Sequence, residues 1–218
     1  MRLLLVVILL SLVKHGQSTN SLATLFDGPS PDTSYADGDK FAILTGDTSV
    51  TIERFDIHMA PVTELVEIWT GDGYPDWPNT NSMTKIWEGT ITGQGQGVAT
   101  PLPAFDPPIE LAENSILGVY ATVEDYQGNN MYHSDGVQAN TVYASDSYIS
   151  LAEGISQWHL HQNFEWPTRW NGVVHYSIPG QTTSPTTLAP SSLAPTISPS
   201  ISPTSKPTPN VSYSVYFV

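Results

Sequence analysis

The chain of 218 residues contains no cysteine, so no disulfide can stabilise its fold. It also has few basic residues: Lys and Arg number 7 against 21 Asp and Glu, which gives a formal net charge of −14. Such a negative field repels phosphate backbones and anionic lipids, which excludes nucleic-acid binding and electrostatic attachment to membranes. Neutral glycans, cationic polymers and calcium remain as partners, or the acidity serves only to keep the protein soluble.

A hydrophobic run long enough to span a membrane is lacking at the amino terminus. The run from Leu3 to Leu10 follows Arg2 and has the length of a signal-peptide core. The small residues Gly16 and Ser18 suit signal peptidase, so we expect residues 1–18 to be a signal peptide that is cleaved after Ser18. The sequence therefore predicts a secreted, extracellular protein.

The carboxyl-terminal part lacks the apolar residues that a core requires. Residues 181–210 consist almost wholly of Pro, Ser and Thr with a few small apolar residues, which predicts a disordered stalk with O-linked glycans. Asn210 begins the sequon Asn-Val-Ser, a candidate N-glycosylation site. The apolar tail, residues 211–218, is too short for a membrane span, and is either the start of a missing domain or a frayed end.

Between these ends, residues 20–180 are enough for one domain with a sizeable core. Apolar residues alternate in short runs separated by Gly, Pro, Asn and Asp, and no amphipathic helix of useful length is found. This pattern predicts an all-β, two-sheet antiparallel sandwich, of jelly-roll or immunoglobulin-like arrangement. We expect strands at Lys40–Leu44, Val50–Met59, Leu65–Thr70, Thr84–Ile91, Gly97–Leu102, Ile109–Leu111, Ile116–Val123, Thr141–Ala144, Ser147–Glu153 and Gly172–Ile178.

The six tryptophans fall into two groups. Trp69 and Trp87 lie within expected strands, so we predict that they belong to the core. Other aromatic residues lie in expected loops beside carboxylates and amides, where a ring can stack on a sugar while Asp and Asn bind its hydroxyls. The predicted ligand-binding residues are Tyr74, Asp76, Trp77, Asn79 and Trp166.

One segment nearly matches the first motif of the cupins. Gly154, His159, His161, Glu165 and Gly172 follow its order, and the resemblance would imply a metal site at His159, His161 and Glu165. The spacing before the first histidine is one residue short, however, and a proline interrupts the expected strand. The second motif would fall where the stalk begins. A polar strand edge is the competing interpretation.

No other catalytic motif was found. The chain has no Gly-x-Ser-x-Gly elbow, no His-Glu-x-x-His helix and no phosphate-binding glycine-rich loop, so we predict neither catalytic residues nor a cofactor. Calcium could bind a loop with Asp27, Asp32, Asp37 and Asp39, but these lack the spacing of an EF-hand. We expect a solvated acidic loop there.

Four segments together resemble a secreted β-domain that recurs, often in tandem, in diatoms and related stramenopiles. They are Phe55–His58, Val66–Trp69, the stretch from Val142 to Gly154, and Arg169–Tyr176. Copies of that domain are joined by similar Pro/Ser/Thr linkers. The resemblance implies an extracellular or wall-associated protein and carries over no catalytic residues.

The leading functional hypothesis is a secreted, non-catalytic extracellular or wall-associated module, adhesive or carbohydrate-binding. A cupin-like metal-dependent enzyme using His159, His161 and Glu165 is one alternative. A purely structural spacer is the other.

Overall fold

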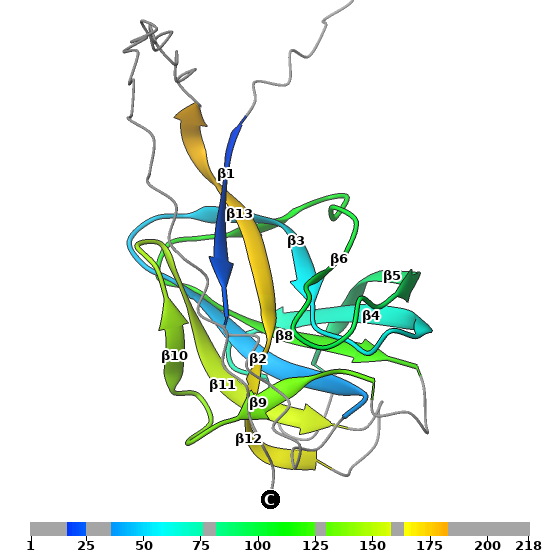
Figure 1. Ribbon diagram of the computed structural model, residues 1–218. Coiled ribbons are helices and arrows are strands. Elements are labelled where there is room, and N and C mark those ends of the chain that lie inside the picture. Colours follow the sequence, from blue (N-terminus) through cyan, green and yellow to red (C-terminus); the bar gives the residue numbers. More distant parts are fainter. Residues whose placement is uncertain (1–16, 25–35, 76–81, 125–129, 158–163, 183–218) are drawn as a thin grey trace, which may run out of the picture. The chain divides into compact units, whose positions relative to one another are not determined.

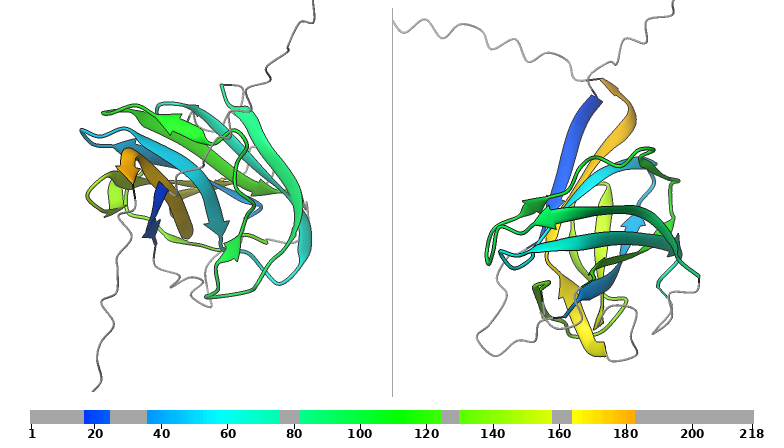
Figure 2. Two further views of the ribbon diagram at one scale, coloured as in Figure 1. Left: turned by 90° about the horizontal axis from the view of Figure 1, so that it is seen from above. Right: turned by 90° about the vertical axis from the view of Figure 1, so that its right-hand side faces the viewer.

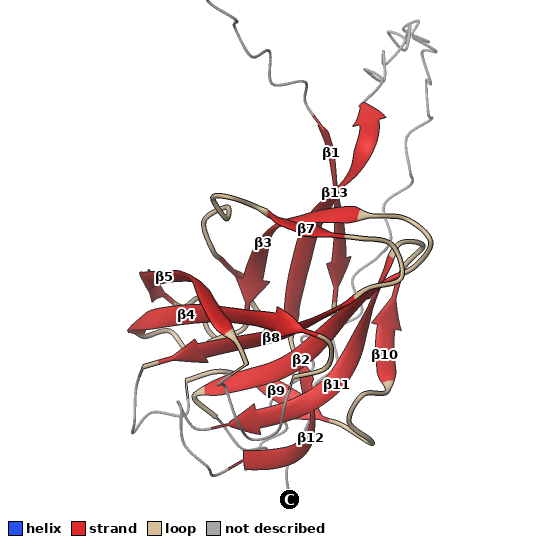
Figure 3. Ribbon diagram, turned by 180° about the vertical axis from the view of Figure 1, so that it is seen from behind, coloured by secondary structure: helices blue, strands red, loops and turns tan. Residues whose placement is uncertain are grey.

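The computed structural model describes residues 17–24, 36–75, 82–124, 130–157 and 164–182. These residues form thirteen strands and no helix, which confirms the all-β prediction (Figure 3). In this part of the chain there is accordingly no helix with the length and apolarity needed to cross a bilayer. The chain divides into two compact units, Met1–Ser184 and Pro185–Val218, and every described residue belongs to the first.

The strands make two antiparallel sheets that form a sandwich (Figure 1). The five-stranded sheet has the order β1 (Gln17–Ala23), β13 (Gly172–Thr182), β3 (Val50–Ile57) and β6 (Thr100–Pro101), and β7 (Ile109–Leu111) also pairs with β3. The eight-stranded sheet has the order β5 (Thr84–Thr92), β4 (Thr63–Asp72), β8 (Ile116–Val123), β2 (Gly38–Thr45), β11 (Ile149–Gln157), β12 (Phe164–Trp170) and β9 (His133–Asp135). The short β10 (Val142–Ser145) pairs with β11.

Strands that are far apart in the sequence lie next to each other. In both views of Figure 2, β1 and β13 run side by side, although they stand at opposite ends of the described chain. Three hydrogen bonds tie the end of β1 to the start of β13: Thr24 N and Oγ1 donate to Gly172 O, and Gly172 N donates to Thr24 Oγ1. The edge of the five-stranded sheet therefore depends on both ends of the domain.

An aromatic cluster joins the two sheets in the core. Phe41 of β2 and Trp170 of β12 are stacked with ring centroids 4.3 Å apart and an interplanar angle of 8°. Phe55 of β3, from the opposite sheet, meets Trp170 edge-on with a centroid distance of 5.9 Å. All three rings are almost inaccessible to solvent. Large aromatic side chains contribute most to the area buried in a core, so this cluster is a main contact between the sheets.

Every strand expected from the sequence is present, although β6 is shorter than predicted. Three strands were not predicted, namely β1, β9 and β12. The prediction of an irregular segment around Trp166 and Pro167 was wrong, because both residues lie within β12. The register between β11 and β12 shifts here, since Gly154 pairs with Thr168 and Ser156 with Glu165, and proline is tolerated at such a bulge.

The predicted core position of Trp69 was also wrong. Val66 and Ile68 of β4 are buried in the core, so alternation directs Trp69 to the outer face of the sheet. There it is half-buried, its Nε1 donates to Glu67 Oε2 at 3.0 Å, and Lys85 Nζ lies 5.6 Å from its ring centroid. Trp87 is partly buried and packs against the core cluster.

Candidate functional site

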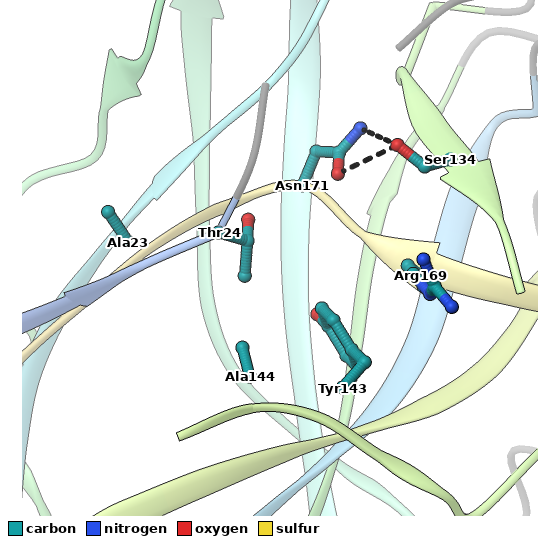
Figure 4. A pocket seen from close by; sticks show the side chains of 7 residues that line it. All are labelled: Ala23, Thr24, Ser134, Tyr143, Ala144, Arg169 and Asn171. Atoms are coloured by element: carbon teal, nitrogen blue, oxygen red, sulfur yellow. Dashed lines mark hydrogen bonds between the residues drawn. The ribbon is translucent and has the colours of Figure 1, made fainter. Parts of the chain in front are cut away.

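A pocket of about 110 Å³ lies where β1 of the five-stranded sheet meets β9, β10 and β12 of the eight-stranded sheet. Its lining residues come from segments distant in sequence: Ala23, Thr24, Ser134, Tyr143, Ala144, Arg169 and Asn171. Figure 4 shows that the residues of β1 and β10 lie on one side of the pocket and Ser134, Arg169 and Asn171 on the other. The two sides differ in chemistry.

Arg169 is held in the polar wall by Glu153. Arg169 Nε donates to Glu153 Oε1 at 2.7 Å, and Glu153 Oε2 accepts the backbone N–H groups of Val137 and Gln138. The Glu153 side chain is 2% exposed, whereas that of Arg169 is 38% exposed. Burial opposes ionisation of Glu153, but the hydrogen bonds from Arg169 and the two N–H groups outweigh it and lower its pKa. Glu153 is thus a carboxylate that compensates the charge of Arg169.

Asn171 and Ser134 complete the polar wall. Asn171 Nδ2 donates to Ser134 Oγ at 3.0 Å, and Ser134 Oγ can donate to Asn171 Oδ1 at 3.2 Å, as drawn in Figure 4. Asn171 lies in the step between β12 and β13, and it is 2% exposed. The pair fixes the orientation of an amide and a hydroxyl beside the guanidinium of Arg169.

The opposite wall is mainly apolar. It consists of the Tyr143 ring, Ala144 and Thr24, whose hydroxyl is bonded to Gly172 O. The methyl group of Ala23 points away from these side chains (Figure 4). Tyr143 Oη donates to Trp170 O at 2.7 Å, so the phenol is anchored. Burial, and then the negative charge of Asp39, raise the pKa of Tyr143 well above its usual value, and the phenol remains neutral.

Two acidic residues are buried at the start of β2. Asp37 and Asp39 are fully buried, so the expectation of a solvated acidic loop was wrong for these two residues. Asp39 Oδ1 lies 3.6 Å from His133 Nδ1, with both side chains inaccessible to solvent. Asp27 and Asp32 lie outside the described residues. Among the residues that are described, no three His, Asp or Glu side chains come together as metal ligands.

The pocket and the predicted site residues do not coincide. Tyr74 follows β4, is partly exposed and does not line the pocket. Glu165 and Trp166 lie in β12, but the structure describes only their backbone. The remaining predicted site residues lie outside the described part of the chain: Asp76, Trp77, Asn79, His159, His161 and Asn210.

None of the pocket residues was predicted as a site residue. One feature of the sequence could have indicated the pocket. Arg169 is one of only four Lys and Arg residues in the acidic body of the chain, and Asn171 and Gly172 follow it closely. The partners from β1, β9 and β10 could not be predicted without the strand pairing. No family model matches the chain, and no curated protein matches its sequence.

Proposed function

We propose that this protein is a secreted, non-catalytic extracellular module that binds a neutral glycan, and that the pocket beside Arg169 holds a sugar ring. The observation that carries the proposal is the pairing of two unlike walls. The Tyr143 ring, Ala144 and Thr24 form one wall, and a guanidinium, an amide and a hydroxyl form the other. A pyranose has the same division, with an apolar face and a rim of hydroxyls.

The size and charge of the pocket favour a single neutral sugar unit. Drug-sized ligands occupy pockets of about 300–1,000 Å³, so about 110 Å³ suits the end of a polymer better than a large molecule. Arg169 is already paired with Glu153, and the rest of the domain is strongly acidic, so an anionic ligand would be repelled. Arg169 uses its Nε for Glu153, which leaves the terminal N–H groups of the guanidinium as donors to sugar oxygens.

Export forms part of this proposal and has its own test. Cleavage after Ser18 would keep the pairs that Thr19–Ala23 of β1 form with β13. We therefore expect the secreted protein to begin at Thr19 and to retain its fold. Amino-terminal sequencing of the protein from the culture medium tests this, and a protein retained in the cell with residues 1–18 intact would contradict it.

Glycan binding is tested with the mature full-length protein. The probes are neutral oligosaccharides of glucose, mannose, xylose and N-acetylglucosamine on an array, followed by calorimetric titration of those retained. The Arg169→Lys variant keeps a positive charge beside Glu153 but loses the planar guanidinium with its several N–H donors. It should therefore bind the oligosaccharide about tenfold more weakly.

Arg54→Lys is the matched control, because Arg54 lies on β3 away from the pocket and pairs with Asp56 at 3.8 Å. It should bind like the wild type. Retention of no oligosaccharide, or equal binding by Arg169→Lys and the wild type, would overturn the proposal.

A metal-dependent enzyme is the second proposal, and one observation favours it. The backbone register places Asp39, Ser156 and Glu165 opposite one another on β2, β11 and β12, and His133 lies beside Asp39. The segment with His159 and His161 connects β11 and β12. Elemental analysis of the purified protein tests it: a stoichiometric transition metal that is lost in Glu165→Gln would support it, and metal-free protein would rule it out.

A further inference from the structure

The sandwich is open along one side, between the edge strands of the two sheets. Among the described strands, β1 pairs only with β13 and β10 pairs only with β11, so each has a free edge. Figures 1 and 3 show β10 beside the β1–β13 pair from opposite directions. We call the space between β1 and β10 the seam. The pocket beside Arg169 forms one end of it, because Ala23 and Tyr143 contribute to its lining.

A second hollow, of about 210 Å³, lies further along the seam. It is lined by Asn20, Ser21, Asp146, Ser147, Tyr148 and Tyr176. From the first hollow to the second, the residue numbers fall along β1 and rise from β10 into the turn that follows it. The three residues from Ala23 to Asn20 span about 10 Å at roughly 3.3 Å per residue. The two hollows are therefore successive parts of one seam.

Like the first hollow, the second combines a tyrosine ring with hydrogen-bonding groups, although its charged group is the carboxylate of Asp146 instead of a guanidinium. Tyr148 is half-buried, and its ring centroid lies 6.4 Å from that of Tyr176. Asp146 Oδ1 accepts the N–H groups of Tyr148 and Ile149, and Asp146 Oδ2 accepts the Tyr176 hydroxyl at 2.6 Å. A carboxylate has about four acceptor positions, so Asp146 keeps one for a ligand hydroxyl. Burial and the bond to Asp146 raise the pKa of Tyr176, which keeps it a neutral donor.

We infer that the seam binds one extended neutral oligosaccharide, with one sugar beside Arg169 and a neighbouring part of the same chain at Tyr148. This inference rests on the proposed function and names its ligand more closely. Two small hollows that follow each other along β1 suit a linear chain better than one compact molecule. Free strand edges can also accept a peptide strand, but that mode needs apolar pockets for alternate side chains, whereas these hollows present hydroxyl, amide and carboxylate groups with tyrosine rings.

The experiment compares ligands of increasing length. Calorimetric titrations with the retained sugar, from the monosaccharide to longer oligomers, are carried out on the mature wild type, Tyr148→Ala and Ser147→Trp. Wild-type affinity should rise about tenfold once a ligand spans both hollows. In Tyr148→Ala that gain should disappear while monosaccharide binding remains. Ser147 is exposed, so Ser147→Trp should block the second hollow without removing a core contact and give the same result.

Ser49→Trp is the matched control, because Ser49 is exposed and lies outside the seam. It should keep the full gain with length. An equal gain with ligand length in wild type, Tyr148→Ala and Ser147→Trp would overturn the inferred second subsite and leave the pocket beside Arg169 unaffected. The loss of affinity in Arg169→Lys tests the proposed function alone. Binding of a short alternating valine–threonine peptide that displaces the oligosaccharide would also overturn the inference.

Discussion

At the scale of single residues, Glu153 connects the stability of the fold with the position of Arg169. It is almost fully buried and accepts hydrogen bonds from Arg169 and from two backbone N–H groups. Hydrogen bonds to a charged group contribute about 1.5–3 kcal/mol each. Glu153→Gln keeps the shape but removes the charge, so we expect the free energy of unfolding to fall by about 2 kcal/mol, as measured by urea denaturation.

The control for this change is Glu88→Gln. Glu88 also pairs with a basic residue, Lys85, but its side chain is 54% exposed on β5. Exposed ion pairs contribute about 0–1 kcal/mol, so this variant should lose less than about 0.5 kcal/mol. Equal losses in the two variants would show that burial of Glu153 has no special role.

His58 makes stability depend on pH. It is fully buried, its Nε2 accepts Gly97 N–H at 2.7 Å, and burial lowers its pKa from 6.5 to about 4. Well above pH 6.5 the imidazole is neutral in both the folded and the unfolded state, so it does not change the free energy of unfolding. Between pH 6.5 and 4 the unfolded state gains a proton that the folded state excludes, so stability falls as pH falls, by about 3 kcal/mol in total.

The test compares wild type with His58→Gln, whose side-chain oxygen can accept the Gly97 N–H but does not titrate. Urea denaturation is repeated across this pH range. The wild-type free energy of unfolding should fall about 1.4 kcal/mol per pH unit more steeply than that of the variant. Parallel curves would rule out His58 as the titrating group. Glu153, with its lowered pKa, adds a further loss only below about pH 4.5.

At the scale of the elements, the step from β12 to β13 requires glycine at position 172. A Cβ there would overlap the Trp170 indole and the Asp56 carbonyl oxygen. Because Trp170 is stacked on Phe41, it cannot yield without disturbing the core. Gly172→Ala should therefore destabilise the protein by about 3 kcal/mol and lower its melting temperature.

Gly46→Ala is the corresponding control. Gly46 is exposed, and the nearest atom to an added Cβ is Tyr148 O at 4.0 Å. Its effect should stay within about 0.5 kcal/mol. A Gly172→Ala protein as stable as Gly46→Ala would mean that β12 and Trp170 adjust freely.

The elements differ in how far the sequence predicts them. Strand β8 is a nearly continuous run of apolar residues, and β11 begins with alternating apolar and polar residues, so their positions could be predicted. β1 has mostly polar residues and is stabilised by pairing with β13, which no local pattern reveals. β12 contains Pro167, which argues against a strand unless the bulge opposite β11 is known. β1, β9 and β12 all contribute residues to the lining of the pocket. Because these three strands could not be predicted from local sequence, the pocket could not be predicted either.

At the scale of the whole molecule, charge distinguishes the partners that composition allows. With 21 acidic and 7 basic residues, the protein would bind a cationic polymer largely through long-range attraction. Salt between about 0.01 M and 1 M shortens the Debye length from about 30 Å to about 3 Å. Affinity for a polycation would therefore fall steeply over this range, whereas affinity for a neutral oligosaccharide should change less than about twofold.

The same salt series also tests the fold. Screening relieves repulsion among the acidic groups, so the free energy of unfolding should rise with sodium chloride even though glycan affinity stays constant. Calorimetry with the retained oligosaccharide and with polylysine, and urea denaturation in the same buffers, measure both effects on one preparation. A glycan affinity that falls in parallel with polylysine binding would show that the ligand is held by charge, and the neutral-sugar assignment of the Arg169 pocket would then be wrong.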